Sequence, residues 1–279
     1  MKFALVNGEK TEATLGAKGI CRACGSDLIA KCGEIKIHHW AHKGNRNCDP
    51  WWENEKEWHR GWKGHFPVDW QEIIHRDKNG EKHIADVKTD QGWVLEFQHS
   101  YLKPQERRER DAFYQNLVWV VDGTRRERDI PQFKRALSEG AMISAKLKIH
   151  SVFSDECALL REWVGCRASV FFDFAEGNKS KGGSLWWLLP WSPGGSAFVL
   201  PFSRADFIGL HQTKPEQGDL DFRAILKILI ESVSRFISKS RAQTRAQELQ
   251  LLAQQQQFLR SRGPKSRPQY SVRKGRRRL

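Results

Sequence analysis

The chain has 279 residues, of which 39% are hydrophobic and 29% charged, so it is long enough to bury one large core or two small ones. No stretch approaches the run of about 18 to 20 apolar residues that a membrane span needs. The first residues, Met1 to Lys10, contain no signal-peptide apolar core, so we expect an intracellular, cytoplasmic protein without a membrane partner. The six Cys are unevenly spaced, which favours metal ligands and buried thiols over a disulfide framework.

The net charge of +14 is concentrated at the C-terminal end of the chain. Residues 235–279 hold 13 Lys or Arg and one acid, Glu248, whereas the preceding 234 residues hold 34 basic and 32 acidic groups. A concentrated basic arm binds polyanions through phosphate charge and counterion release. The final cluster of Arg and Lys at 273–278 favours nucleic acid as the partner, and the alternative is a tail that only solubilises the protein.

Residues 1–50 contain four of the six Cys and three of the ten His, and this enrichment predicts a zinc-binding module. Cys21-x2-Cys24 places two thiolates on a tight turn, which is typical of the first half of a structural zinc site. We predict that His42 and Cys48 complete the site, with His39 as the substitute. A closed four-ligand site would stabilise a segment too short to bury a core of its own. The alternative is a pair of buried Cys with scattered surface His.

The next segment, residues 51–124, predicts a mixed α/β core in the order helix, three strands, helix, strand. Trp58, His59 and Trp62 give the first helix its amphipathic spacing. Turn-forming residues at 77–80 and 90–92 separate the three strands. The expected elements are a helix at 53–63, strands at 70–75, 83–89 and 93–97, a helix at 104–116 and a strand at 117–121.

Residues 125–218 predict a small β-rich accessory unit, and residues 219–279 a helix followed by the basic tail. The expected strands lie at 169–174, 185–191 and 197–201, joined by Gly-rich turns at 178–183 and 192–196. Ser203 is a plausible N-cap for a short helix at 204–210. Residues 219–257 have helical periodicity, and we expect disorder beyond Arg260, where Gly, Pro, Ser and Arg dominate.

Two acidic residues near the ends of neighbouring strands form a second candidate site. Asp86 and Glu96 lie on strands joined by a short turn, so their carboxylates can converge. Two carboxylates at one end of a sheet make an oxygen-rich site for Mg²⁺ or Mn²⁺, an ion that activates water and neutralises charge on a phosphodiester. Gln98 alternates with Glu96 on the same strand face, where its amide can orient water or contact a phosphate.

Glu55, His59 and Lys63 recur at positions i, i+4 and i+8 and therefore share one helix face. Glu55 could add a third carboxylate to the metal site, and His59 could serve in proton transfer or phosphate contact. An exposed stripe of Glu, His and Lys is usually a solvated face, and an isolated Asp and Glu at this spacing is a weak signal. The combination in one ordered block favours a catalytic site.

The same block resembles the competence protein CoiA-like family. The preceding segment with Cys21-x2-Cys24, Lys31-x-Gly33, His39-Trp40-Ala41-His42 and Cys48 is similar to the zinc-finger-like region often found before that core. The resemblance covers about residues 18–124. Its core motifs are Glu55-x2-Trp58-His59-x2-Trp62-Lys63, His83-x2-Asp86-Val87, Glu96-Phe97-Gln98-His99-Ser100, Glu109-Arg110-x3-Tyr114 and Val118-Trp119-Val120-Val121-Asp122-Gly123.

That family looks like a branch of the PD-(D/E)XK nuclease superfamily, which implies a mixed sheet flanked by helices and a Mg²⁺- or Mn²⁺-dependent deoxyribonuclease in DNA uptake, recombination or processing. By the superfamily pattern Asp86 and Glu96 are metal ligands, and Glu55 supports them from the first helix. Gln98 takes the position more often held by Lys, and Ala85 stands where the pattern has Pro. The side chains expected to contact the substrate are His59, Lys63 and Arg110.

Two functions of other classes stay open on the sequence. The first is a non-catalytic DNA-binding adaptor that keeps a degenerate nuclease core and recruits a recombinase or processing enzyme. The intact pair of Asp86 and Glu96 favours catalysis over this interpretation. The second is a zinc-dependent RNA-binding protein, which competition between RNA and DNA would test.

Overall fold

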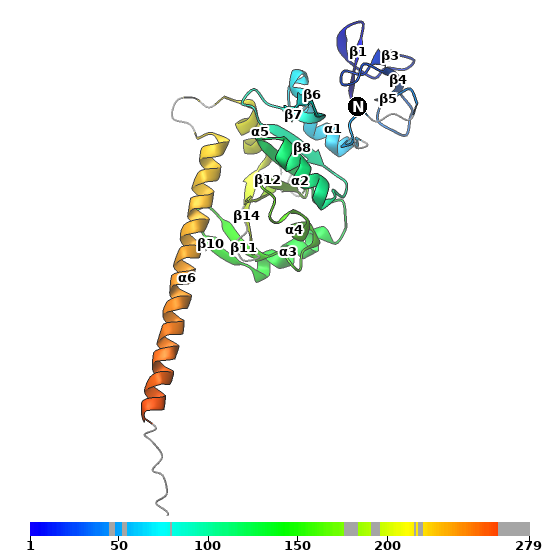
Figure 1. The fold of residues 1–279 in the computed structure, drawn as a ribbon. Helices are drawn as coiled ribbons and strands as arrows, with labels where there is room; N and C mark the ends of the chain where they lie inside the picture. Colours follow the sequence, from blue (N-terminus) through cyan, green and yellow to red (C-terminus); the bar gives the residue numbers. More distant parts are fainter. Residues whose placement is uncertain are drawn as a thin grey trace, which may run out of the picture. The chain divides into compact units, whose positions relative to one another are not determined.

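The computed structural model describes residues 1–44, 48–51, 55–78, 80–175, 184–190, 196–214, 216 and 220–261. The chain divides into two compact units, Met1–Ser232 and Val233–Leu279. The described residues contain two sheets and six α-helices (Figure 1), so the expected mixed α/β class is confirmed. The expected turn at 178–183, most of the turn at 192–196 and the tail beyond Ser261 lie outside the described residues.

The first sheet belongs to the N-terminal module and is antiparallel, in the order β2-β1-β3-β4-β5. Its small core includes Ala4, Leu28 and Trp40. A Cβ at Gly19 would lie 2.9 Å from the Cβ of Ala4, so only glycine lets these strands approach so closely. The strands are β1 (Phe3–Val6), β2 (Glu9–Glu12), β3 (Lys18–Ile20), β4 (Asp27–Lys31) and β5 (His39–His42).

The second sheet has nine strands in the order β10-β11-β14-β13-β12-β9-β8-β7-β6. Strands β6, β7 and β8 form an antiparallel meander, and β8, β9 and β12 run parallel to one another. The strands are β6 (Gln71–Arg76), β7 (Lys82–Lys88), β8 (Val94–Gln98), β9 (Leu117–Asp122), β10 (Ala141–Ser144), β11 (Ile149–Phe153), β12 (Ser169–Asp173), β13 (Ser184–Leu188) and β14 (Ser196–Ser203).

The predicted order of the segment 51–124 matches the structure. Helix α1 (Glu57–Gly64) precedes the meander, and α2 (Pro104–Phe113) connects β8 to β9. A parallel pair of strands needs such a crossover because a hairpin can only join antiparallel strands. This arrangement places Asp86 on β7 beside Glu96 on β8.

The predicted boundary at residue 124 lies within one continuous sheet. Strand β12 pairs in parallel with β9, with Phe171 opposite Val120, and β13, β14 and β11 extend the same sheet. Every residue of β9 and β12 is buried, which is typical of parallel strands covered on both faces. An apolar strand such as β9 cannot stand at a sheet edge, so the later strands complete the core that residues 51–124 begin.

The remaining helices of the Met1–Ser232 unit cover this sheet. Helix α3 (Asp129–Glu139) packs on β11 and on α4 (Ala158–Trp163), and α5 (Arg204–Gln212) packs on β14. Ser203 is the N-cap of α5 and accepts a hydrogen bond from the Asp206 backbone N–H, as its sequence position predicts.

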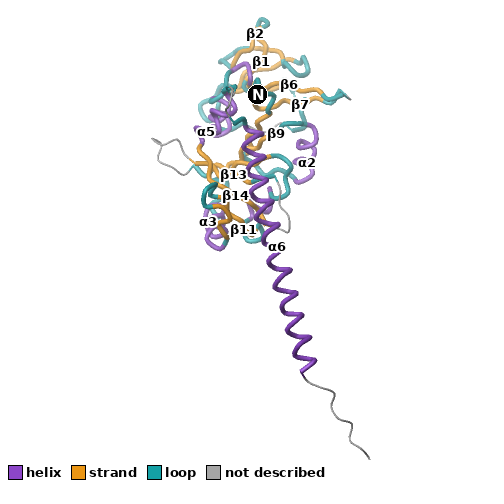
Figure 2. Tube along the Cα trace, turned by 90° about the vertical axis from the view of Figure 1, so that its left-hand side faces the viewer, coloured by secondary structure: helices purple, strands orange, loops and turns teal. Residues whose placement is uncertain are grey.

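Helix α6 (Phe222–Ser261) begins in the first unit and forms the described part of the second. It is one continuous helix in Figure 2. All the side chains from Ser238 to Leu259 are exposed, among them the apolar Leu249 and Leu252. No helix in the described ranges has both the length and the apolar character needed to cross a bilayer.

Asp173, at the end of β12, holds helix α1 against the sheet. Its carboxylate accepts hydrogen bonds from the indole N–H groups of Trp58 at 3.0 Å and Trp62 at 2.9 Å. The Arg204 guanidinium donates a third bond at 2.6 Å, and the Asp173 side chain is 1% exposed. Since α1 carries the candidate site residues His59 and Lys63, Asp173 sets the position of that face of the site.

Replacing this carboxylate should therefore destabilise the fold. We expect Asp173→Ala to lower the free energy of unfolding by about 2 to 4 kcal/mol, because the buried Trp62 donor and the partly buried Trp58 and Arg204 donors lose their acceptor. Chemical denaturation followed by tryptophan fluorescence measures this loss. Asp155→Ala, at an exposed position, is the control, and equal stability of the two variants would contradict the anchoring role.

Candidate metal centre and acidic cavity

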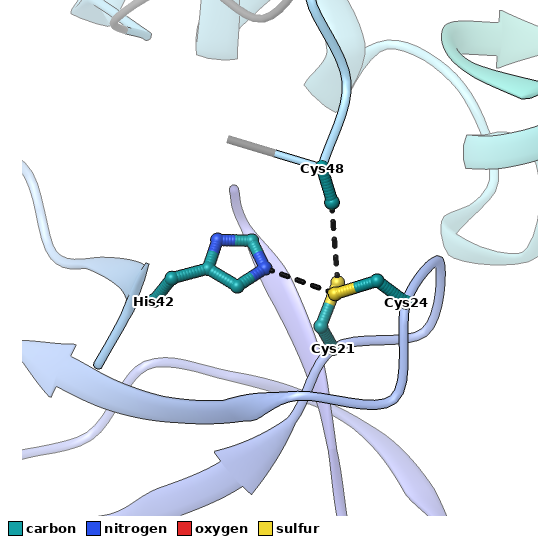
Figure 3. Close-up of side chains that lie close together, drawn as sticks. All are labelled: Cys21, Cys24, His42 and Cys48. Atoms are coloured by element: carbon teal, nitrogen blue, oxygen red, sulfur yellow. Dashed lines mark hydrogen bonds between the residues drawn. The ribbon is translucent and has the colours of Figure 1, made fainter. Parts of the chain in front are cut away.

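Four ligand side chains of the N-terminal module converge on one point (Figure 3). Cys21 and Cys24 come from the turn between β3 and β4, His42 ends β5, and Cys48 lies on the chain that leaves the module. Their four ligand atoms all lie within 4.8 Å of one another. Gly25, with φ of 72°, adopts the left-handed conformation that closes the Cys turn.

The geometry of this cluster fits zinc. Zn–S bonds of about 2.3 Å in a tetrahedron place two sulfurs about 3.8 Å apart, and the Sγ atoms of Cys21 and Cys48 are separated by 3.6 Å. The Sγ of Cys24 is 3.3 Å from Nε2 of His42. Three thiols and one imidazole are a common donor set for structural zinc, so the cluster could hold that ion.

The acidity of the thiols is consistent with this use. The hydrogen bond between Cys21 and Cys48 lowers the pKa of Cys21 below its ordinary value. The same contact raises the pKa of Cys48, because a second negative charge beside the first is unfavourable. A bound zinc ion would displace the remaining thiol protons.

The cluster consists of the four residues that the sequence spacing predicted. His39, the predicted substitute, is not among them, and its Nδ1 lies 2.9 Å from the carbonyl oxygen of Ile37. Cys32 also lies outside the cluster. Strand β5 explains why His42 belongs to the cluster and His39 does not. Successive side chains of a strand point to opposite faces. His39 and His42 are three residues apart and therefore point to opposite sides.

A cavity of about 60 Å³ brings together the residues predicted for the second site. Asp49, Glu72 and Tyr114 also line it, although the sequence analysis assigned no role to Asp49 or Glu72. The predicted residues on its wall are Glu55, His59, Lys63, Asp86, Glu96, Gln98 and Arg110.

Asp86 and Glu96 reach toward each other across β7 and β8. The Phe97 N–H donates to Oδ2 of Asp86 at 3.0 Å, and the Asp86 N–H donates to Oε1 of Glu96 at 3.4 Å. Burial and the charge of Asp86 raise the pKa of Glu96 well above its usual value. The pair therefore tends to share a proton or to recruit a cation.

His59 compensates part of this charge from helix α1. Its Nε2 lies 2.8 Å from Oδ1 of Asp86. Burial alone would raise the pKa of Asp86, but the charge and hydrogen bond of His59, together with Lys63, lower it below the usual value. Asp86 is thus the ionised member of the pair.

Lys63 lies between two further carboxylates. Its Nζ is 2.6 Å from Glu55 and 3.0 Å from Glu72, and its side chain is 3% exposed. Burial acts to raise the pKa of Glu72, but Lys63 and the Lys2 backbone N–H lower it to about 2. The buried Lys63 ammonium is therefore already paired with two carboxylates of the protein itself.

Glu72 connects the cavity to the N-terminal sheet. Its carboxylate accepts hydrogen bonds from the backbone N–H groups of Lys2 at 2.7 Å and Phe3 at 3.1 Å. Its φ of 50° lies in the left-handed region that a residue with a Cβ rarely adopts. Sequence reasoning missed Glu72 because these partners lie about 70 positions earlier in the chain, where nothing in the local pattern indicates them.

Glu55 shares the cavity but not the carboxylate pair. Its Oε1 is bound to Lys63, and its Oε2 lies 2.6 Å from the Arg60 guanidinium. Within the part of the chain that the structure describes, the Cys21 cluster is the one group of three or more His, Cys, Asp or Glu side chains whose ligand atoms converge. The three acids predicted around one cation do not form such a group.

Arg110 and Gln98 both have protein partners at the cavity. The Arg110 guanidinium donates to Glu96 at 3.2 Å, to Glu106 at 2.5 Å and to the Trp51 carbonyl oxygen at 2.8 Å. The Gln98 amide donates to the Ser100 carbonyl oxygen at 3.2 Å. A substrate contact by Arg110 therefore has to share or replace the bond to Glu96.

The zinc cluster and the cavity are neighbours along the chain. Asp49 follows Cys48, and its carboxylate pairs with Nδ1 of His83 at 2.9 Å and accepts from the Ile84 N–H at 2.7 Å. Trp51 stacks on His83 with ring centroids 3.2 Å apart. A metal ion that fixes Cys48 would also fix this wall of the cavity.

Residues 9–50 match the family model for the N-terminal domain of competence protein CoiA. The match contains all four members of the metal cluster and suggests a competence-related role. It ends before α1, so it does not extend to the acidic cavity. Comparison with curated proteins and with solved structures finds no match.

The metal content of the purified protein tests the cluster. We expect about one zinc ion per chain, measured by elemental analysis, because a closed site of three Cys and one His retains structural zinc. Cys24→Ser should lose the ion, whereas Cys32→Ser should keep it. An unchanged zinc content in Cys24→Ser would place the metal elsewhere.

Proposed function

We propose that this protein is a metal-dependent nuclease that hydrolyses DNA phosphodiester bonds at the acidic cavity. The observation that carries the proposal is the pair of Asp86, which is partly buried, and Glu96, which is buried, on adjacent strands. The charge balance of the cavity supports it, because burial and the charge of Asp86 keep the pKa of Glu96 raised although Arg110 lies beside it. A divalent cation would supply the missing charge.

In this proposal the carboxylates of Asp86 and Glu96 hold Mg²⁺ or Mn²⁺, which when bound supplies an activated water and neutralises charge on the phosphodiester. His59 orients the Asp86 carboxylate through its 2.8 Å contact. Gln98, on the same strand face as Glu96, is placed to hold the attacking water. The ion pair between Lys63 and Glu55 holds these two side chains of the cavity wall in position.

The topology supports the resemblance to the PD-(D/E)XK superfamily. Helix α1 is followed by the β6–β8 meander, crossover helix α2 and parallel strand β9. Asp86 lies on the second strand of the meander, and Glu96 and Gln98 lie on the third. Glu55 lies just before α1, outside the helix on which the sequence predicted it, close to where the superfamily pattern has an acid. This is the order in which the superfamily pattern places its site residues.

A second cleft beside the cavity offers positive charge to a phosphate substrate. A cleft of about 460 Å³ shares Glu55 with the cavity and is also lined by Lys36, Ile37 and Lys56. Its two walls come from the N-terminal module and from the start of α1. We infer that the module helps to bind the substrate there, and that the basic tail adds phosphate contacts.

Substitution of one ligand tests the proposed chemistry. We expect Glu96→Ala to lower the rate of Mn²⁺-dependent cleavage by about 100-fold or more, because the cation loses half of its protein ligands. DNA binding should be largely unchanged. The assay uses single-stranded, double-stranded and branched DNA, and each is incubated with and without the metal.

Glu127→Ala, at an exposed position on the loop before α3, is the matched control and should cleave like the parent. Equal rates for Glu96→Ala and the parent, after purification to remove contaminating nucleases, would exclude the proposed roles of the cavity.

A non-catalytic DNA-binding adaptor is the second candidate. One observation favours it: the Arg110 guanidinium already binds the Glu96 carboxylate at 3.2 Å, which competes with a cation for that ligand. Gln98 also stands where the superfamily more often has Lys. Metal-independent binding of every DNA form, with no cleavage of any, would support the adaptor.

The role of the basic tail is separable from catalysis. Truncation after Gln257 removes nine Lys or Arg, so DNA binding should weaken and its dependence on salt should flatten, by up to about 0.9 in slope for each phosphate that the tail no longer neutralises. Fluorescence anisotropy over a range of salt concentrations measures this slope. A slope equal to that of the full chain would leave the tail as a solubilising segment.

A further inference from the structure

One polar group at the acidic cavity has no partner among the residues that the structure describes. The Tyr114 hydroxyl makes no hydrogen bond there, although its side chain is only 4% exposed. Three other cavity atoms also lack a hydrogen bond, but Oε1 of Glu55 and Nε2 of His59 each have an ion pair, and the Arg110 guanidinium binds the protein through its other nitrogens. A buried hydroxyl without a partner destabilises the protein unless something else binds it.

The surroundings of Tyr114 explain why the fold does not satisfy this hydroxyl itself. The ring packs edge-on against His75 at 5.2 Å and Phe113 at 4.9 Å between centroids, so it cannot turn toward solvent without breaking this packing. The nearby Glu96 carboxylate is bound to Arg110 and to the Asp86 N–H. Tyr114 thus lines the cavity with a hydroxyl that has no partner among the described residues, while the Glu96 carboxylate on the same cavity already accepts other bonds.

The hydroxyl remains a donor at neutral pH. Burial, with the negative charges of Glu96 and Asp49, raises the pKa of Tyr114 above its ordinary value. A protonated phenol among carboxylates favours an oxygen acceptor that arrives with its own counterion, because a lone anion would be repelled. A phosphate oxygen bound together with a divalent cation meets that requirement.

We infer that Tyr114 is a substrate-binding residue whose hydroxyl donates a hydrogen bond to a phosphate oxygen in the cavity. The identity of the ligand rests on the proposed function, whereas the availability of the donor rests on the packing of Tyr114 alone. Two consequences follow. The hydroxyl should contribute nothing to the stability of the free protein, and it should contribute to binding of the ligand.

The test compares Tyr114→Phe with the parent and with Tyr101→Phe, which removes a hydroxyl from a side chain that is 59% exposed and outside the cavity. Chemical denaturation of the free proteins gives their stability. Titration with thymidine 5′-monophosphate in the presence of Mn²⁺ gives the affinity for a phosphate probe and requires no cleavage. We expect Tyr114→Phe to be at least as stable as the parent and to bind the probe roughly tenfold more weakly, with Tyr101→Phe unchanged in both.

A loss of stability in Tyr114→Phe would overturn the inference, because it would show that the hydroxyl already has a structural partner. Unchanged affinity for the probe, or no binding by the parent, would overturn it as well. Weakened phosphate binding in Tyr114→Phe, with no cleavage by the parent on any DNA, would keep the Tyr114 contact and reject the nuclease. Cleavage by the parent, together with unchanged probe binding by Tyr114→Phe, would keep the nuclease and reject the Tyr114 contact.

Discussion

The structure depends on compensating the negative charge that is buried around the acidic cavity. An ionised carboxylate is costly to bury unless a cation or several hydrogen-bond donors accompany it. Lys63 meets this need for Glu55 and Glu72, and His59 does so for Asp86. Both bases come from α1, so their ion pairs with the cavity carboxylates also hold this helix in place.

Glu96 is the carboxylate for which this compensation is incomplete. Arg110 lies 3.2 Å away, yet burial and the charge of Asp86 still raise the pKa of Glu96. A site that binds a cation must leave a deficit of this kind, because a fully compensated carboxylate has no electrostatic reason to accept an ion. The compensated carboxylates of Glu55, Glu72 and Asp86 and the less compensated carboxylate of Glu96 thus line the same small cavity.

The sequence predicted the parts of the site that local periodicity or short spacing encodes. The positions of Cys21, Cys24, His42 and Cys48 along the chain, and of Asp86 and Glu96 on neighbouring strands, were sufficient to group them. It did not predict the partners of those residues. Glu72 and Asp173 act through contacts with residues about 70 and 110 positions away, and such contacts leave no periodic pattern.

The fold shows the same limit. Helices and strands of 51–124 were visible because apolar residues recur at regular spacing. The five strands of the N-terminal sheet are three to five residues long, and β2, with the sequence Glu-Lys-Thr-Glu, has no apolar residue. Strands β9 and β12 pair in one sheet because these two apolar strands meet in the folded chain. Composition alone does not specify which apolar strands pair.

The two candidate sites are coupled through the chain between Cys48 and Trp51. A bound zinc ion would restrict Cys48, and the following Asp49 and Trp51 contact His83 and Arg110 at the cavity wall. Arg110 in turn holds the Glu96 carboxylate. Loss of the zinc ion would therefore loosen the wall next to the carboxylate pair before it unfolds the nine-stranded sheet, whose core of Trp119, Phe172 and Leu188 is built without the N-terminal module.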